Sequence, residues 1–297
     1  MDRFEAEMHA AALAASPYYR ILRKLERREM YSWPLPEGVK FGLIVDVETT
    51  GLDPAKDEVI ELGMLRFAYN ATGTILGPVA EYQSFQEPSK PIPDHITRLT
   101  GISNAMVTGH QIHGLSVEAF AQSVDLVIAH NAGFDRRFCE RLASSFVYRP
   151  WACTQTQIPW RSEGIEGSKL LYITTQQSFW HEGHRALDDC YAVLELLEMP
   201  LPKTHRITMS VLLESADKPT VKVWALNAPF AIKDRLKERG YRWNVGDDGR
   251  PRAWHREIDP TQVNDEIAFL DGLGFEDQLE PLVTEVDALI RFSDRLF

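Results

Sequence analysis

A short apolar run that ends in acidic residues constrains the fold of this chain more than any other feature. Gly42-Leu43-Ile44-Val45-Asp46-Val47 has the composition of a central strand that is buried in a sheet. Asp46 and Glu48 lie two residues apart at its end, so both carboxylates point to one face. Such a pair is costly unless a cation lies between the two groups, and oxygen-only ligands suit Mg²⁺ or Mn²⁺. The alternative is a strand that runs out into solvent, where acidic residues are common.

The segments after this strand indicate an α/β domain. Further strands are predicted at 59–69, 75–85, 126–129 and 151–154, and helices at 115–122, 132–144, 167–175 and 185–199. A chain that begins with strands and then alternates between helices and strands is typical of a sheet that is covered by helices. The length of 297 residues allows about two domains.

Residues 1–37 are predicted to be a helical extension and a linker. An Ala-rich helix reaches Ala15, and Ser16-Pro17 has the form of the start of a second helix. The basic residues between Arg20 and Arg28 would form one face of that second helix. This face either contacts nucleic acid or a partner, or is the solvated side of a docking helix.

Residues 201–297 are predicted to be a small, basic, tryptophan-rich α+β domain. A strand at 221–224, helices at 229–239 and 260–273, and a turn at 247–249 between two short strands are expected. Between 218 and 256 the chain has ten Lys or Arg and four Asp or Glu, although its net charge is −11. An acidic chain is a poor candidate for binding nucleic acid by charge alone, so this asymmetry indicates two regions with different tasks.

Basic and aromatic residues alternate in this last region. Those predicted to contact nucleic acid are Lys222, Arg242, Trp243, Arg252 and Trp254. Single strands bind through backbone charge and base stacking, which is the chemistry that this pattern offers. The alternative is that the tryptophans form the core of a small domain.

Two more acidic residues lie on predicted helices. Asp135 shares a helical face with apolar residues, as does Asp189, so both are expected to point inward. Asp188 falls on a solvated face. His184 lies on the loop before Asp189, and His181 is a nearby rival for its role.

Three segments together resemble the motifs of the DEDDh exonucleases, a ribonuclease H-like family that includes the epsilon proofreading subunit of bacterial DNA polymerase III. The segments are Asp46-x-Glu48-Thr49-Thr50-Gly51, His130-Asn131-Ala132-x-Phe134-Asp135 and His184-x-Ala186-x-x-Asp189. Their order matches the family, as does the stretch from Leu99 to Ile102. The resemblance implies a ribonuclease H-like three-layer fold with a mixed sheet over residues 38–200.

The resemblance also implies a site and a reaction. Two Mg²⁺ or Mn²⁺ ions would be held by Asp46, Glu48, Asp135 and Asp189, with His184 as the general base. Contacts to the terminal nucleotide would come from Thr49, Thr50, Gly51, Leu52, Ile102 and Phe134. The implied activity is a 3′–5′ exonuclease that releases nucleoside 5′-monophosphates, with single-stranded DNA preferred. An oligoribonuclease-like or RNA-trimming enzyme and a non-catalytic accessory subunit of a polymerase are the alternatives, and the last should lack one of the five groups.

The remaining expectations concern location and partners. The chain has no run of about 20 apolar residues, so no membrane association is expected. Three cysteines without metal-ligand spacing predict reduced thiols and a cytoplasmic protein. The segment 278–282 has a faint likeness to peptides that bind sliding clamps, which gives a polymerase or clamp as a candidate partner. The sequence does not predict the oligomeric state.

Overall fold

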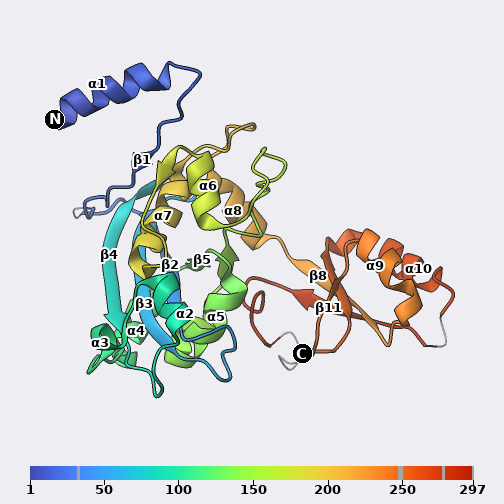
Figure 1. The fold of residues 1–297 in the computed structure, drawn as a ribbon. Coiled ribbons are helices and arrows are strands. Elements are labelled where there is room, and N and C mark those ends of the chain that lie inside the picture. The colour runs from blue at the N-terminus through green and yellow to red at the C-terminus, as the bar shows by residue number, and fades with distance from the viewer. Residues whose placement is uncertain (32–33, 247–249, 276–277, 296–297) are drawn as a thin grey trace.

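The computed structural model describes residues 1–31, 34–246, 250–275 and 278–295, which form an α/β body and a smaller sheet domain (Figure 1). The elements up to β6 are α1 (Arg3–Ala14), β1 (Arg23–Lys24), β2 (Lys40–Thr49), β3 (Val59–Tyr69), β4 (Ile75–Phe85), α2 (Asp94–Thr100), α3 (Asn104–Val107), α4 (Gly114–Ala121), β5 (Leu126–Ala129), α5 (Ala132–Leu142), η1 (Ser144–Tyr148) and β6 (Trp151–Cys153). The later ones are α6 (Leu170–Gln176), β7 (Phe179–Trp180), α7 (Ala186–Glu198), α8 (Thr208–Asp217), β8 (Thr220–Leu226), η2 (Phe230–Ile232), α9 (Lys233–Glu238), β9 (Arg242–Trp243), β10 (Trp254–Ile258), η3 (Pro260–Gln262), α10 (Val263–Asp271) and β11 (Glu280–Val286).

A five-stranded mixed sheet in the order β4-β3-β2-β5-β6 forms the centre of the body. The pairs among β4, β3 and β2 are antiparallel, and β2, β5 and β6 run parallel. Alternation along β2 sends Ile44 into one apolar core with α7 and α8, and sends Leu43 and Val45 into another with α4 and α5. Helices therefore cover both faces, which confirms the predicted three-layer ribonuclease H-like fold.

The N-terminal segment differs from its prediction after α1. Residues beyond the helix are extended, and β1 pairs in parallel with β7, so the second helix predicted from Ser16 is wrong. The extended chain lets arginines reach acidic residues of α7: Arg27 lies 2.8 Å from Asp188, and Arg28 lies 2.9 Å from Glu195. The basic residues thus serve to dock this segment on the body. Trp33, in the predicted linker, lies outside the described residues.

Helix α8 was missed by the sequence analysis. Its side chains Met209 and Leu212 are fully buried in the same core cluster as Ile44 of β2. The helix has no side-chain cap, and its apolar residues alternate with polar ones too briefly for a clear pattern. These contacts join residues 208–217 to the core of the body, whereas the domain boundary expected at residue 200 stays a prediction.

The C-terminal domain is an antiparallel sheet in the order β11-β8-β10-β9, with α9 and α10 on one face. Its first strand and both helices fall where the sequence predicted them, and the turn expected at 247–249 lies outside the described residues. Strand β11 was not predicted. Because it pairs with β8 along its whole length, the clamp-like segment at Glu280–Leu282 is part of a sheet.

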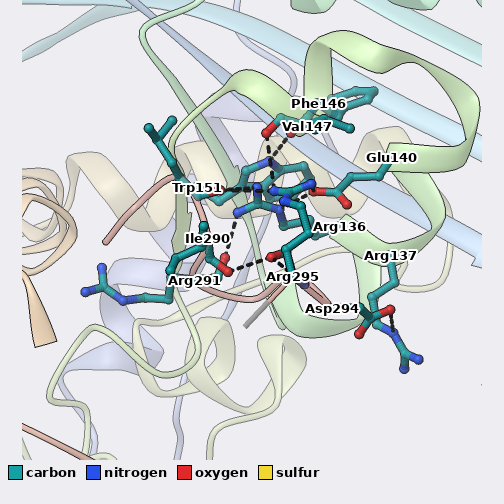
Figure 2. A network of polar contacts seen from close by, with 12 residues as sticks. Arg136, Arg137, Glu140, Phe146, Val147, Trp151, Ile290, Arg291, Asp294 and Arg295 are labelled. Carbon is teal, nitrogen blue, oxygen red and sulfur yellow. Dashed lines mark hydrogen bonds and ion pairs between the residues drawn. The ribbon is translucent and has the colours of Figure 1, made fainter. Parts of the chain in front are cut away.

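After β11 the chain returns to the body as a segment that we call the C-terminal strap, residues 287–295. The amide of Trp151 donates to the carbonyl of Ala288 at 2.8 Å, so the strap lies beside β6 at the edge of the sheet. The buried guanidinium of Arg136 donates to the carbonyls of Arg291 and Leu289, at 2.6 and 2.5 Å (Figure 2). The strap therefore covers Arg136 on α5.

Two further findings concern membrane-spanning helices and the cysteines. Among the described residues, no helix is both long enough and apolar enough to cross a bilayer. Cys139, Cys153 and Cys190 are buried free thiols.

Candidate active site

Three carboxylates from two elements meet at the end of β2. Asp46 and Glu48 lie on the face of the sheet that is covered by α7, and Asp189 comes from the first turn of that helix. One ligand oxygen from each of the three lies within 4.8 Å of the others. The structure therefore brings together two of the sequence motifs, which are more than 130 residues apart, in a spacing that a single cation could bridge.

A glycine lets α7 approach this closely. Gly63 of β3 is the register partner of Asp46, and a Cβ atom built on it would lie 2.4 Å from the carbonyl carbon of Ala186. The backbone of the helix thus rests directly on the sheet at the position beside Asp46. Any side chain at residue 63 would push Asp189 away from the other carboxylates.

Asp135 completes the acidic set from the opposite layer. It is 2 % exposed on α5, and its Oδ1 accepts a hydrogen bond from the amide of Val47 at 3.2 Å. That amide is available because the pairing of β2 with β5 ends at Ile44. All four predicted carboxylates line one hollow of about 290 Å³, which we call the catalytic hollow, together with His184.

Burial and mutual repulsion perturb these acids. Desolvation raises the pKa of Glu48 to about 8, and repulsion from Asp189 adds to the effect. Desolvation likewise raises the pKa of Asp135 to about 8, against the hydrogen bond from Val47, and raises that of Asp46 well above its ordinary range. Four acids that repel one another this strongly are arranged for a positive charge between them.

His184 and His181 both contact Asp189, but by different atoms. The backbone amide of His184 donates to Asp189 Oδ2 at 2.9 Å, with His184 in the left-handed region at φ 65°. This backbone conformation leaves the exposed imidazole of His184 at the catalytic hollow. His181 is buried, and its Nε2 lies 2.7 Å from Asp189 Oδ1. His181 therefore orients a carboxylate, whereas Asp188 is bonded to Arg27 outside the hollow.

A fifth buried acid was missed by the sequence analysis. Glu61 of β3 is the register partner of Glu48 and is fully buried. Its carboxylate accepts hydrogen bonds from Arg185 at 3.0 Å, from Gln83 at 2.7 Å and from the amide of Ala186 at 3.1 Å. Glu61 ties β3 to the start of α7. The feature of the sequence that could have identified Glu61 is an acidic residue at an inward-facing position of an apolar strand.

The residues expected to meet the terminal nucleotide divide into two groups. Leu52, which is 81 % exposed, and Phe134 line the catalytic hollow. Ile102 is instead fully buried in a separate cluster with Ile60 and Ile96, so the structure does not bring it to the hollow.

The polar groups of the Thr49–Gly51 segment form hydrogen bonds within the loop that follows β2. Thr49 Oγ1 donates to the carbonyl of Gly51 at 2.5 Å, and Thr50 Oγ1 accepts from the amide of Glu58 at 3.0 Å. A Cβ atom on Gly51 would lie 2.5 Å from the carboxylate of Asp57, so this glycine is needed for packing inside the loop.

His130 links the catalytic hollow to the loop that follows β6. Its Nε2 lies 2.8 Å from the carbonyl of Ser168, which only accepts, so Nε2 carries the proton. Its Nδ1 then accepts from Thr154 Oγ1 at 2.8 Å. Burial lowers the pKa of His130 to about 4, which keeps the ring neutral. Asn131 precedes α5 as expected, but at φ 84° its side chain makes no capping bond.

The residues of the C-terminal domain that were predicted to contact nucleic acid also fall into two groups. Trp254 lies in the apolar core of that domain, as the structural alternative anticipated, and Trp243 packs on it with ring centroids 5.5 Å apart. Register pairing puts Lys222 and Arg242 on the other face of the sheet, which carries no helix. Both line a second hollow, against the body. Arg252 is exposed and is not among the residues that line this hollow.

Curated relatives of the chain are exonucleases and polymerase subunits. It is 28% identical over 161 residues to DNA polymerase III subunit epsilon of Aquifex aeolicus, covering 52% of this chain and 77% of that one. It is 26% identical over 206 residues to the Treponema pallidum subunit, covering 65% and 91%. Against the PolC-type DNA polymerase III of Thermotoga petrophila it is 28% identical over 199 residues, 63% of this chain and only 14% of that one. The chain thus spans a seventh or less of the length of the PolC-type relatives.

A solved structure and a family model agree with this fold. E. coli exonuclease I in complex with a dT13 oligonucleotide superposes with a TM-score of 0.51 at 14% identity, over 80% of this chain and 69% of that one. The model of the Exonuclease family, RNase_T, matches residues 43–197, which include all four carboxylates and His184. The chain is therefore a member of the Exonuclease (RNase_T) family.

Proposed function

We propose that the chain is a metal-dependent 3′–5′ exonuclease that hydrolyses the last phosphodiester bond of a nucleic acid and releases a nucleoside 5′-monophosphate. The observation that carries this proposal is the convergence of Asp46, Glu48, Asp135, Asp189 and His184 on one hollow. A protein that had kept the fold only for binding would have no need to hold four repelling acids beside an imidazole.

The donor set fits two Mg²⁺ or Mn²⁺ ions. All four side chains offer carboxylate oxygens, which these hard cations prefer, and the raised pKa values of Asp46, Glu48 and Asp135 support a site for a counter-charge. Asp46, Glu48 and Asp189 would hold the ions from one side, and Asp135 from the other. When bound, such a pair of ions stabilises the charge that develops on the attacking and leaving oxygens.

The protein supplies the proton transfer and the orientation. Water attacks the terminal phosphorus while the exposed imidazole of His184, at the catalytic hollow, takes its proton. The bond from phosphorus to the 3′ oxygen of the preceding nucleotide breaks, and the phosphate stays with the released nucleotide. His181 fixes one oxygen of Asp189 and the His184 amide fixes the other, so the base and the carboxylate keep a constant spacing.

DNA is proposed as the preferred polymer. The relatives named above are DNA polymerase III subunits, and E. coli exonuclease I is solved with a DNA oligonucleotide, which supports a task in DNA replication or repair. Buried reduced thiols support the expected cytoplasmic location.

A ladder experiment tests the proposal. The protein is incubated with Mg²⁺ or Mn²⁺ and 5′-labelled single-stranded or duplex DNA and RNA, with His184→Ala as the matched control. We expect a ladder that shortens from the 3′ end with DNA, and an at least ~10²-fold slower one with the variant. Equal ladders for the two proteins would remove His184 from the reaction. A faster ladder with RNA would favour the RNA-trimming alternative.

A further inference from the structure

The helix-free face of the C-terminal sheet lies over the body and encloses a hollow between the two. This interdomain hollow has a volume of about 580 Å³ and is lined by Lys222, Arg242 and Arg256 from the sheet and by Thr156 and Ser215 from the body. A second hollow of about 670 Å³, the loop hollow, lies along residues 155–168 and also contains Thr156 and Arg242. Because Thr156 and Arg242 line both, the two hollows adjoin each other.

The loop hollow leads toward the catalytic hollow. Ser168 lines the loop hollow, and its carbonyl is bonded to His130, which lines the catalytic hollow. Leu170, two residues further along, also lines the catalytic hollow. The three hollows therefore form a series from the four carboxylates to the C-terminal sheet, and each of the two outer hollows is larger than the catalytic one of about 290 Å³.

The outer hollows contain cations in an acidic protein. Their lining has five Lys or Arg and three Asp or Glu: Arg161, Lys222, Arg242, Arg256 and Arg291 against Glu166, Glu257 and Asp259. Two of these cations are already paired with acids, Arg256 with Glu266 and Arg291 with Glu257. Within the described ranges, the exposed guanidinium groups of Arg161 and Arg242 take part in no hydrogen bond or ion pair. Cations that are left without a protein acid beside a hollow are suited to phosphate groups.

We propose that the loop hollow and the interdomain hollow bind the single strand that precedes the 3′ nucleotide, with Arg242 at the junction between them. This inference rests on the proposed function, since it takes the catalytic hollow as the place of the terminal nucleotide. It assigns to the C-terminal domain the task of holding polymeric substrate by its phosphates, and it makes the enzyme faster on a long strand than on a trinucleotide.

The test compares two charge reversals on two substrates. Arg242→Glu changes the junction, and Arg235→Glu makes the same charge change on α9, on the far face of the C-terminal sheet. Hydrolysis is measured on single-stranded DNA of about 3 and about 20 nucleotides, lengths chosen below and above a usual single-strand site. We expect Arg242→Glu to lower kcat/KM for the long strand about 10-fold relative to the trinucleotide, mainly through KM, and Arg235→Glu to leave this ratio unchanged. The salt dependence of the KM of the long strand should also weaken with Arg242→Glu.

Other outcomes would overturn the inference or the proposed function separately. An equal loss on both substrates, no loss on either, or the same loss with Arg235→Glu would overturn the binding path. If the wild-type protein cleaves neither substrate, the proposed function fails. The binding path is then tested by measuring the affinity for the strand, which does not depend on hydrolysis. For that purpose fluorescence anisotropy with the long strand compares Asp46→Ala with Asp46→Ala/Arg242→Glu, and unchanged affinity in the double variant rejects the path.

Discussion

At the scale of single residues, the site combines strong local repulsion with tight placement. Asp46 lies between three other acids, and its pKa is raised first by burial and then by repulsion from Asp189 and Asp135. Groups held in this state destabilise the folded protein when no cation is present. Function and stability therefore place opposite demands on the same carboxylates.

Replacing one of these acids should separate the two effects. We expect Asp46→Asn and Asp135→Asn to slow hydrolysis by more than ~10³-fold, because the lost charge stabilisation amounts to several kcal/mol. In metal-free buffer the same variants should have a higher Tm than the wild type. Single-turnover assays and thermal melts measure both quantities, and retained turnover would contradict the assigned roles.

The stability of the metal-free protein should fall as the pH rises. Glu48 and Asp135 have a pKa of about 8 in the folded protein and about 4 when unfolded, so between these values the folded state holds more protons. The contribution of these two groups to the free energy of unfolding is fully present below about pH 4 and is lost as the pH rises to about 8. His130, with its pKa lowered to about 4, contributes the opposite slope, but only below about pH 6.5.

Thermal melts between about pH 6.5 and 8 therefore isolate the carboxylates. We expect the Tm of the metal-free protein to decrease over this range, and Mg²⁺ to raise the Tm more at the upper end, where protons no longer compete. Asp135→Asn should flatten the slope. A Tm that rises over the same range would contradict the pKa assignments.

At the scale of elements, the close approach of α7 to β3 depends on Gly63. We expect Gly63→Ala to lower the free energy of unfolding by about 1–3 kcal/mol, because the added methyl group meets the backbone of Ala186. Urea denaturation measures this change. Gly133→Ala on α5 is the control, since a Cβ there meets nothing within 4 Å, and it should be neutral or stabilising by up to ~1 kcal/mol. Equal effects at the two glycines would show that α7 can move without cost.

Elements with local signals could be predicted, and elements that depend on distant partners could not. The strands 59–69, 75–85 and 126–129 have clear apolar patterns and fall where expected. The segment around β1 has a helical spacing of apolar residues at Ile21, Leu22 and Leu25, but acids of α7 and the edge of β7 hold it extended. Strand β11 is half exposed, and only its partner β8 identifies it.

The site follows the same rule. Asp46, Glu48, Asp135 and Asp189 could be found because each lies at a strand end or on an apolar helix face. His181 and Glu61 could not be assigned, because their roles consist of hydrogen bonds to residues far away in the chain.

At the scale of the whole molecule, the last described residues hold together parts that are distant in sequence. The strap leaves the C-terminal sheet and bonds both β6 and Arg136 of α5, the helix that carries Asp135. Arg136 has no exposed surface, and its third nitrogen, Nε, donates to Glu140 at 2.7 Å. The domain that we propose to bind the strand is thus fastened to the helix that supplies one of the acids.

Two truncated chains should differ in stability according to the contacts with the body that each one loses. A chain that ends at Val286 leaves the buried Arg136 without two acceptors, at a cost of about 1–3 kcal/mol for each unmade bond. A chain that ends at Pro202 also loses Met209 and Leu212 from the core of the body, each worth about 1.5–3 kcal/mol. We expect the midpoint of urea denaturation to fall from the full chain to the first truncation and again to the second. Equal midpoints for all three chains would show that strap and α8 contribute no stability to the body.

The position of the strap in the chain has a consequence for biosynthesis. A nascent polypeptide that has reached the end of α7 already contains every acid and the imidazole of the site. The carbonyls that receive the Arg136 guanidinium, those of Leu289 and Arg291, are made about ninety residues later. The helix that carries Asp135 can therefore complete its contacts with the strap only after these later residues have been synthesised.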